Sequence, residues 1–298
     1  MTDISYPSMD KGAAKIKYGN RKPHLTAPRP WEETMQFKHC TLDFDGPVAV
    51  LTLNHQEVMN AVSMDMLAGL AEALDEIEAN KAAVRCVVLT GAGRAFCTGA
   101  NLQGRNQQQK PGRSNAGAAL ETAFHPFLRR IRNLHCPLVT AVNGPAAGAG
   151  MSFALLGDMI LVARSAYFLQ AFRRIGLVPD CGSTWLLPRL VGKARAIELS
   201  LMGERLPAEK ALEWGLVNRV YDDGVLMEEA MKLARELASG PTVAQSLIRK
   251  LYWDSEENSF EDQLNLEYQS QRTAGTTEDF REGVTAFLEK RPAKFAGK

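Results

Sequence analysis

The chain has 298 residues, of which 45% are hydrophobic and 23% are charged, as expected for a globular protein with a substantial core. Its formal net charge of +1 gives no indication of a nucleic-acid or anionic-membrane partner, and no apolar run reaches the roughly 18 residues of a membrane span. Five scattered cysteines without a CxxC pair predict free thiols in a reducing, cytoplasmic setting. Five histidines without paired spacing predict no metal site.

Residues 1–37 are polar and lack hydrophobic periodicity, so we expect an extended arm outside the core. The first predicted strand is Val48–Leu53, and Ser63 is a typical N-cap for the helix that follows it. That helix is expected to bury an apolar stripe made of Leu67, Leu70, Leu74 and Ile77. A second strand is expected at residues 85–89. This strand–helix–strand order predicts parallel pairing.

Two turns rich in small residues follow β-branched runs in the sequence. Residues 91–102 read GAGRAFCTGANL, and residues 142–150 read VNGPAAGAG. Small residues allow a ligand to approach bare backbone N–H groups, and a helix opened by the second turn would leave its first N–H groups without an internal partner. Two such turns would be able to aim two donors at one developing negative oxygen, as in an oxyanion hole. The alternative is a pair of ordinary strand–helix connections.

The first turn also invites comparison with a dinucleotide-binding loop, because GAG follows a predicted strand. That fingerprint requires a third glycine, and Phe96 occupies its position here. The chain contains no GxSxG sequence, so hydrolase chemistry based on a nucleophile elbow is not expected either.

The middle of the chain alternates predicted helices and strands. A helix at residues 120–133 precedes a strand at Leu138–Val142. A short helix ending near Asp158 is expected next, followed by a strand at Met159–Ala163. Beyond residue 185 the pattern is mostly helical.

The predicted organisation has no flexible linker between independent domains. It comprises the arm at 1–37, a core at 38–240 and a helical region at 241–298. Within the core, the polar and irregular residues 103–118 predict a mobile loop over a site. The last helix is expected to start at the sequence TTED, residues 276–279, which resembles a capping box. Its apolar face would consist of Phe280, Val284 and Phe287.

Asp180 is a candidate acid–base residue. It lies in the segment IGLVPDCGSTWLL, residues 175–187, whose other members are apolar or small. Desolvation penalises a charged carboxylate, so these neighbours are expected to raise its pKa toward the range useful for moving protons. The structural alternative is that Asp180 caps the helix carrying Trp185 and Leu186.

Four sequence segments together resemble the enoyl-CoA hydratase/isomerase (crotonase) superfamily: AFCTGANL, AVNGPAAGAG, FxxIGLVPDCGSTWLLPRLVG and AEKALEWGLVNRV. The resemblance runs from about residue 40 to the end of the chain, and from about residue 160 onward it is especially to isomerases of aromatic breakdown. It implies an α/β fold, a crotonase-like ββα superhelix with a C-terminal helical trimerisation region. It also implies an acyl-CoA thioester as substrate, no separate cofactor, and homotrimers or dimers of trimers.

The resemblance assigns roles to particular residues. The oxyanion hole would use the N–H groups of Ala100 and Ala149, provided that the backbone at Ala149 suits a residue with a Cβ atom. Backbone contacts to CoA are implied for Val58, Met59, Asn60, Thr98, Asn101 and Leu102. The tail from Phe287 to Phe295 resembles the element that closes over the CoA nucleotide, often from a neighbouring subunit, with Phe287, Lys290 and Lys294 as its contacts. A solvated basic end is the alternative interpretation of that tail.

The chain departs from the superfamily's hydratases at two positions. Ser152 and Phe172 stand where those enzymes carry glutamates, whereas Asp180 matches the carboxylate of several isomerases. Isomerisation of an acyl-CoA, with Asp180 moving a proton beside the thioester, is therefore the preferred interpretation. Phe172 would dry the pocket and stack on an aromatic acyl group, or simply fill space. The alternatives are an enoyl-CoA hydratase lacking both usual glutamates and a non-catalytic acyl-CoA-binding protein.

Overall fold

The computed structural model describes residues 34–102 and 117–298, and the following account concerns these residues. Most of the expected arm, residues 1–33, and most of the expected loop, residues 103–116, lie outside the described part. Residues 35–37, assigned to the arm from sequence, form a short edge strand of the main sheet. Among the described helices, none combines the length and apolarity needed to cross a membrane.

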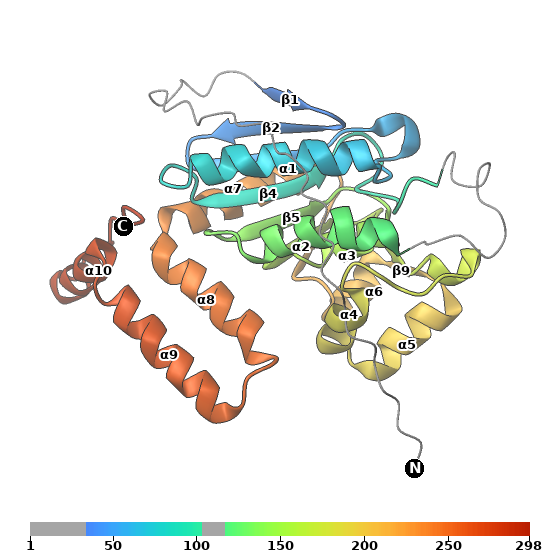
Figure 1. The fold of residues 1–298 in the computed structure, drawn as a ribbon. Helices are drawn as coiled ribbons and strands as arrows, with labels where there is room; N and C mark the ends of the chain where they lie inside the picture. The colour runs from blue at the N-terminus through green and yellow to red at the C-terminus, as the bar shows by residue number, and fades with distance from the viewer. Residues whose placement is uncertain (1–33, 103–116) are drawn as a thin grey trace, which may run out of the picture. The chain divides into compact units, whose positions relative to one another are not determined.

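A seven-stranded sheet forms the centre of the fold, in the order β1-β2-β3-β4-β5-β7-β10 (Figure 1). Its strands are β1 (Met35–Phe37), β2 (Cys40–Asp45), β3 (Val48–Leu53), β4 (Cys86–Gly91), β5 (Leu138–Val142), β7 (Met159–Ala163) and β10 (Arg219–Tyr221). The first three strands pair antiparallel, and the remaining neighbours pair parallel. The central strands β4 and β5 are wholly buried, which suits their continuous apolar sequences.

Helix α1 (Met64–Ala79) joins β3 to β4 and confirms the predicted strand–helix–strand unit. The Ser63 hydroxyl accepts the N–H of Met66, so the predicted N-cap is present. The predicted apolar stripe is buried, as are Met66 and Ala73 beside it. Helix α1 packs against β1, β2 and β3, whereas α7 (Leu226–Ser239) packs against β3, β4, β5 and β7.

A smaller sheet in the order β6-β8-β9 lies beside the main one. Its strands are β6 (Ala146–Ala147), β8 (Tyr167–Leu169) and β9 (Arg205–Pro207). The surrounding helices are a π-helical turn η2 (Leu120–Phe124) that runs into α2 (His125–Arg132), then α3 (Ala149–Ala154), α4 (Ser183–Val191), α5 (Lys193–Met202) and α6 (Ala208–Glu213). Helix α3 ends four residues before Asp158, earlier than predicted, and the Asp158 carboxylate accepts the N–H of Leu138.

Three helices complete the chain: α8 (Thr242–Ser255), α9 (Phe260–Ala274) and α10 (Glu278–Glu289). In Figure 1 they extend at the lower left, away from α4 and α5 at the lower right. Arg249 fixes α8 to the core, because its buried guanidinium pairs with Asp158 and donates to the carbonyls of Ile131, Arg132 and Leu134. Helix α10 begins as predicted, with the Thr277 hydroxyl accepting the N–H of Phe280.

Candidate active site

The two small-residue turns contact each other through their main chains. The N–H of Cys97 donates to the carbonyl of Pro145 at 3.1 Å, and the N–H of Ala147 donates to the carbonyl of Cys97 at 2.9 Å. Gly150 allows this approach, since a Cβ atom there would lie 2.1 Å from the Cys97 oxygen. The turns are therefore one rigid unit and not two separate connections.

Glycines with positive φ shape the point where the turns meet. Gly99 has φ 96°, and a Cβ atom on it would lie 3.8 Å from the nitrogen of Ala149. Gly148 has φ 51° and ψ −126°, a region that residues with side chains rarely adopt. The two amides named from the sequence, those of Ala100 and Ala149, thus lie beside this meeting point.

The N–H groups of Ala100 and Ala149 both point away from the main-chain acceptors beside them. Val62 donates to the carbonyl of Gly99 at 2.7 Å and accepts from the N–H of Asn101 at 2.8 Å, so the N–H of Ala100 points away from Val62. Ala149 is the first residue of α3, where an N–H has no partner within the helix. Its φ is not in the positive region, which satisfies the condition set by its Cβ atom. Neither N–H donates to another main-chain group of the described residues.

The loop before α1 lies alongside the first turn. The Thr98 N–H and hydroxyl both donate to the carbonyl of Met59, each at 3.2 Å. The Asn60 amide is buried and donates to the carbonyls of Ala92 and Ala95 at 2.9 and 2.8 Å. The main-chain N–H of Asn60 donates to the carbonyl of His55 at 2.9 Å, so both its side chain and its N–H hold the loop in shape. Among the expected contact residues, the structure places Thr98 against Val58 and Met59, and it joins Asn101 to Val62 just beyond Asn60. Leu102 is exposed at the end of the same turn.

Asp180 reaches the second turn through its main chain. Its carbonyl accepts the Ser152 hydroxyl at 3.2 Å, the Ser183 hydroxyl at 2.9 Å and the Ser183 N–H at 3.1 Å. Gly182, and not Asp180, occupies the N-cap of α4, so the capping alternative is wrong. The Phe172 ring is buried, with its Cζ atom 3.7 Å from the position of a Cβ atom on Gly148.

The cysteines of this region are not nucleophiles. Burial raises the pKa of the Cys97 thiol to about 12, and it raises the pKa of Cys181 still further. Both side chains therefore remain protonated near neutral pH and fill space. All five cysteines are free thiols, as predicted.

The tail residues Phe287, Lys290 and Lys294 are not brought to the turns within one chain. Arg85 holds the carbonyl of Phe295 at 3.2 Å, and Arg85 directly precedes β4, whereas the first turn follows β4. The length of that strand, about 20 Å, separates the tail's anchor from the turn. The expected contact between this tail and CoA therefore requires the tail of another chain or a different arrangement of the last residues.

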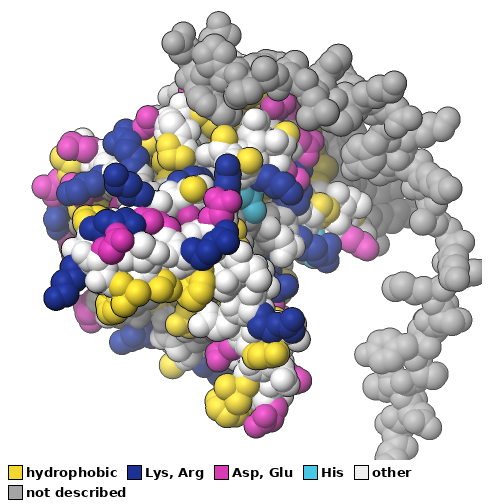
Figure 2. Space-filling model, turned by 90° about the vertical axis from the view of Figure 1, so that its left-hand side faces the viewer, with side chains coloured by type: hydrophobic (Ala, Val, Ile, Leu, Met, Phe, Trp, Pro, Cys, Tyr) yellow, Lys and Arg dark blue, Asp and Glu magenta, His cyan; other side chains and the backbone are white. Residues whose placement is uncertain are grey.

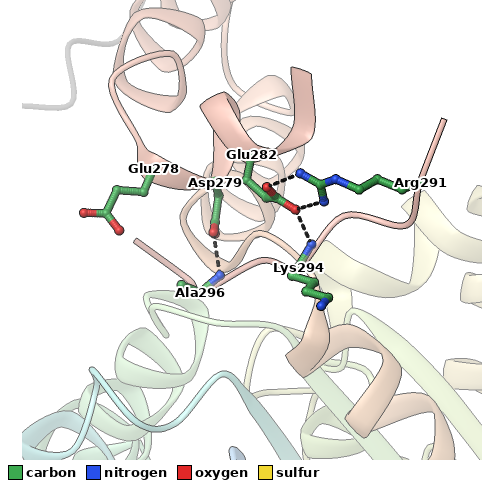
Figure 3. Close-up of a pocket in the computed structure, with 6 residues that line it drawn as sticks. All are labelled: Glu278, Asp279, Glu282, Arg291, Lys294 and Ala296. Atoms are coloured by element: carbon green, nitrogen blue, oxygen red, sulfur yellow. Dashed lines mark hydrogen bonds and ion pairs between the residues drawn. The ribbon is translucent and has the colours of Figure 1, made fainter. Parts of the chain in front are cut away.

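The tail instead folds back on α10 around a charged pocket of about 430 Å³. Figure 3 shows the Glu282 carboxylate holding the Arg291 guanidinium and the main-chain N–H of Lys294. The buried Asp279 carboxylate accepts the N–H groups of Ala296 and Gly297 at 2.6 and 2.9 Å. These groups satisfy one another, so the pocket is a structural clasp and is separate from the candidate active site.

Two functional contributions had no clear signal in the sequence. Asn143 joins the turns, since its side chain accepts the N–H of Gly91 at 3.2 Å and donates to the carbonyl of Gly93 at 3.0 Å. The sequence signal for this role of Asn143 was its position between a strand and the Gly144-Pro145 pair. In the sequence, Ser152 was noted only because it occupies the position of a hydratase glutamate. Its hydrogen bond to Asp180 is visible only in the tertiary structure.

Two sheets, a pair of interlocked amide turns and three C-terminal helices define a crotonase-type α/β enzyme fold. The enoyl-CoA hydratase/isomerase family model matches residues 43–298. This chain belongs to that family, whose members act on acyl-CoA thioesters.

Individual relatives support the assignment. The chain is 47% identical to the 1,2-epoxyphenylacetyl-CoA isomerase of Escherichia coli K12, over 84% of this chain and 95% of the relative. It is 41% identical to a Rhodobacter capsulatus protein named "Probable enoyl-CoA hydratase", over 89% of this chain and all of the relative. The solved structure of an enoyl-CoA hydratase subunit from Geobacillus kaustophilus HTA426 is similar with a TM-score of 0.81, at 34% identity over 89% of this chain and all of that one.

Proposed function

We propose that this protein is an acyl-CoA isomerase that moves a proton beside a thioester. The observation that carries the proposal is the hydrogen bond between Ser152 and Asp180, which holds Asp180 against the helix that begins at Ala149. Ser152 and Phe172 occupy the positions of the hydratase glutamates and carry no carboxylate. The isomerase relative with 47% identity supports the same reaction class.

The expected mechanism uses one carboxylate and two amides. The thioester oxygen would lie between the N–H groups of Ala100 and Ala149. The Asp180 carboxylate removes a proton from the carbon next to the thioester carbonyl, and the electron pair moves onto that oxygen, where the two donors stabilise it. The protonated Asp180 then returns the proton to the carbon two positions further along, which moves the double bond. No other group is gained or lost.

Phe172 provides a basis for the acyl preference. Its buried ring packs beside Gly148, next to the proposed oxyanion hole, where it excludes water. An aromatic face favours stacking on a ring of the substrate. We therefore propose that acyl-CoA thioesters carrying a ring are preferred over simple aliphatic ones, in line with the ring in the name of the E. coli relative.

Replacing Asp180 with Asn tests the reaction. Purified protein would be incubated with trans-3-hexenoyl-CoA, and formation of the conjugated 2-enoyl product followed by its ultraviolet absorbance. We expect a loss of about 10²–10⁴-fold in kcat, as is usual when a general acid–base group is removed. Asp75→Asn makes the same chemical change on the exposed side of α1 and should retain full activity. Full turnover by Asp180→Asn would refute the assignment.

Two alternatives remain open and give different results. A hydratase would consume the conjugated absorbance of crotonyl-CoA, and the relative from R. capsulatus is the observation in its favour. A non-catalytic binder would bind both esters, measured by calorimetry, without converting either of them.

The proposal includes assembly into a homotrimer or a dimer of trimers. Large apolar side chains are exposed on the C-terminal helices: Ile248, Tyr252, Phe260, Leu264, Tyr268, Phe280, Val284, Phe287 and Leu288. Figure 2 shows apolar patches on this side of the molecule among charged side chains. Surfaces of this kind usually mark a protein interface. A neighbouring chain would also supply the basic tail that one chain keeps away from its own turns.

Light scattering coupled to size exclusion tests the assembly. We expect a mass three or six times that of one chain. A stable, active monomer would overturn this part of the proposal without affecting the role of Asp180.

A further inference from the structure

We propose that Ser152 is a positioning residue that sets the distance between the proton-transfer group and the oxyanion hole; this inference rests on the proposed function. Ser152 is fully buried in α3 and donates its hydroxyl to the carbonyl of Asp180 at 3.2 Å. A buried helical serine ordinarily bonds to the carbonyl four residues earlier. Here that atom, the carbonyl of Gly148, is farther away, at 3.5 Å.

The hydrogen bond from Ser152 differs from the other two that the Asp180 carbonyl accepts. Both of those come from Ser183, three residues later, and belong to the same local turn at the start of α4. Ser152 comes from a separate element, 28 residues earlier in the chain. Its bond therefore fixes where the Asp180 turn lies, whereas the bonds from Ser183 fix the local shape of that turn.

The backbone after Asp180 is strained and depends on such support. Cys181 has φ 52° and Gly182 has φ 82°, so two consecutive residues adopt the left-handed region. This region is unfavourable for a residue such as cysteine and persists when surrounding structure imposes it. The Ser152 bond is made to the peptide group that links Asp180 to Cys181. Removing the bond would free the turn to relax toward a less strained conformation.

The position of Ser152 within α3 explains why it would affect catalysis. Ala149 and Ser152 are three residues apart, about one turn of the same helix. The amide that would hold the thioester oxygen and the hydroxyl that holds Asp180 therefore move together. Displacements of about 1 Å between reacting groups reduce rates by as much as 10²-fold.

The experiment measures turnover of trans-3-hexenoyl-CoA by Ser152→Ala. We expect kcat to fall by about 10–10²-fold, with KM and the calorimetric affinity for the ester within about twofold. Ser152→Cys keeps the shape of the side chain but is a weak donor, so it should behave like Ser152→Ala. Ser200→Ala removes a comparable helical hydroxyl in α5 and should leave turnover unchanged.

A double variant separates positioning from a general loss of folding. If Ser152 acts through Asp180, adding Ser152→Ala to Asp180→Asn should cause no further loss of kcat. The inference would be overturned if the double variant lost kcat by the product of the two single losses. It would also be overturned if the loss of kcat in Ser152→Ala matched the fraction of unfolded protein, or if Ser152→Cys had normal activity. Normal activity of Asp180→Asn would instead refute the proposed function, so the two failures are distinguishable.

Discussion

The paired turns and the C-terminal helices are built by opposite means. At the turns, main chain meets main chain, glycines allow contacts that no side chain would permit, and the residues at the meeting point, 95–97 and 146–150, are buried. On α8 to α10, side chains such as Tyr252, Tyr268 and Phe287 are 75%, 62% and 82% exposed. The turns make their contacts within one chain, whereas the C-terminal helices carry apolar side chains that are exposed in the single chain.

This difference separates two functions of one polypeptide. The proposed oxyanion hole requires a fixed geometry at the turns, because oxyanion donors act by being held in place before the reaction. The proposed assembly requires of the C-terminal helices a surface that recognises a neighbouring chain. Arg249 joins α8 to the core through Asp158, whose carboxylate also holds the start of β5, the strand that leads into the second turn. Its removal therefore provides the strongest test of the comparison.

The largest effect on stability is expected for Arg249→Met. Burial raises the pKa of the Asp158 carboxyl, and the positive charge of Arg249 lowers it. Loss of the guanidinium therefore leaves a buried carboxylate without its balancing charge. The free energy of unfolding in urea should fall by about 3–5 kcal/mol. Arg235→Met breaks the exposed pair with Asp45 and should cost about 0–1 kcal/mol. Equal losses for both variants would contradict this account.

Gly150→Ala should have the next largest effect, and it would disrupt the turns directly. The added Cβ atom would collide with the carbonyl of Cys97, which is main chain and cannot rotate away. We expect about 3 kcal/mol of destabilisation together with loss of isomerase activity. Gly224→Ala meets no atom within 4 Å and should change stability by less than about 1 kcal/mol. Normal turnover by Gly150→Ala would show that activity does not depend on the close contact between Gly150 and the Cys97 carbonyl.

Tyr268→Asp tests the C-terminal side of the comparison. Because Tyr268 is exposed in the single chain, the substitution should change that chain's unfolding free energy by only about 0.5 kcal/mol. It should nevertheless reduce the assembled mass in light scattering, since a charge would enter an apolar interface. Thr285→Asp places the same charge on a position that is already polar and exposed, and it should leave the mass unchanged. A monomeric wild-type protein would make this prediction void.

The smallest effect concerns the stacked rings of His39 and His55, whose centroids are 3.7 Å apart. Burial and the neighbouring His55 lower the pKa of His39, so the folded state favours the neutral ring. As pH falls below about 6.5, the unfolded chain binds the proton first and stability decreases. His39→Asn suits the positive φ at this position and should flatten the change in unfolding free energy between pH 7.5 and 5.5. An unchanged slope would show that the pair is not responsible.

Elements with a strong local pattern were predictable from the sequence. Val48–Leu53, Leu138–Val142 and Met159–Ala163 are strands as expected, and Ser63 and Thr277 cap helices as expected. The strand Cys40–Asp45 was not predicted, since two aspartates interrupt its apolar residues. The strand at Ala146–Ala147 exists through its pairing with β8 and has no local signal of its own.

The candidate site shows the same limit. The sequence pointed to both turns, because small residues after strands have a direct physical meaning. It also pointed to Asp180 as a candidate, through its apolar neighbours. It did not indicate what connects them, since a serine inside a short apolar helix has no distinctive spacing. Contacts between separate elements, such as that from Ser152 to Asp180, depend on packing that the pattern of one chain does not express.

The clasp between Asp279 and the last residues makes the chain end sensitive to trimming. Asp279 is 3% exposed, and its N–H donates to the carbonyl of Lys298. Its carboxylate accepts the main-chain N–H groups of Ala296 and Gly297. Truncation after Phe295 would leave the buried Asp279 carboxylate without these main-chain donors at the first turn of α10. Helix α10 would then fray from that turn, and the apolar face that it presents would lose its orientation.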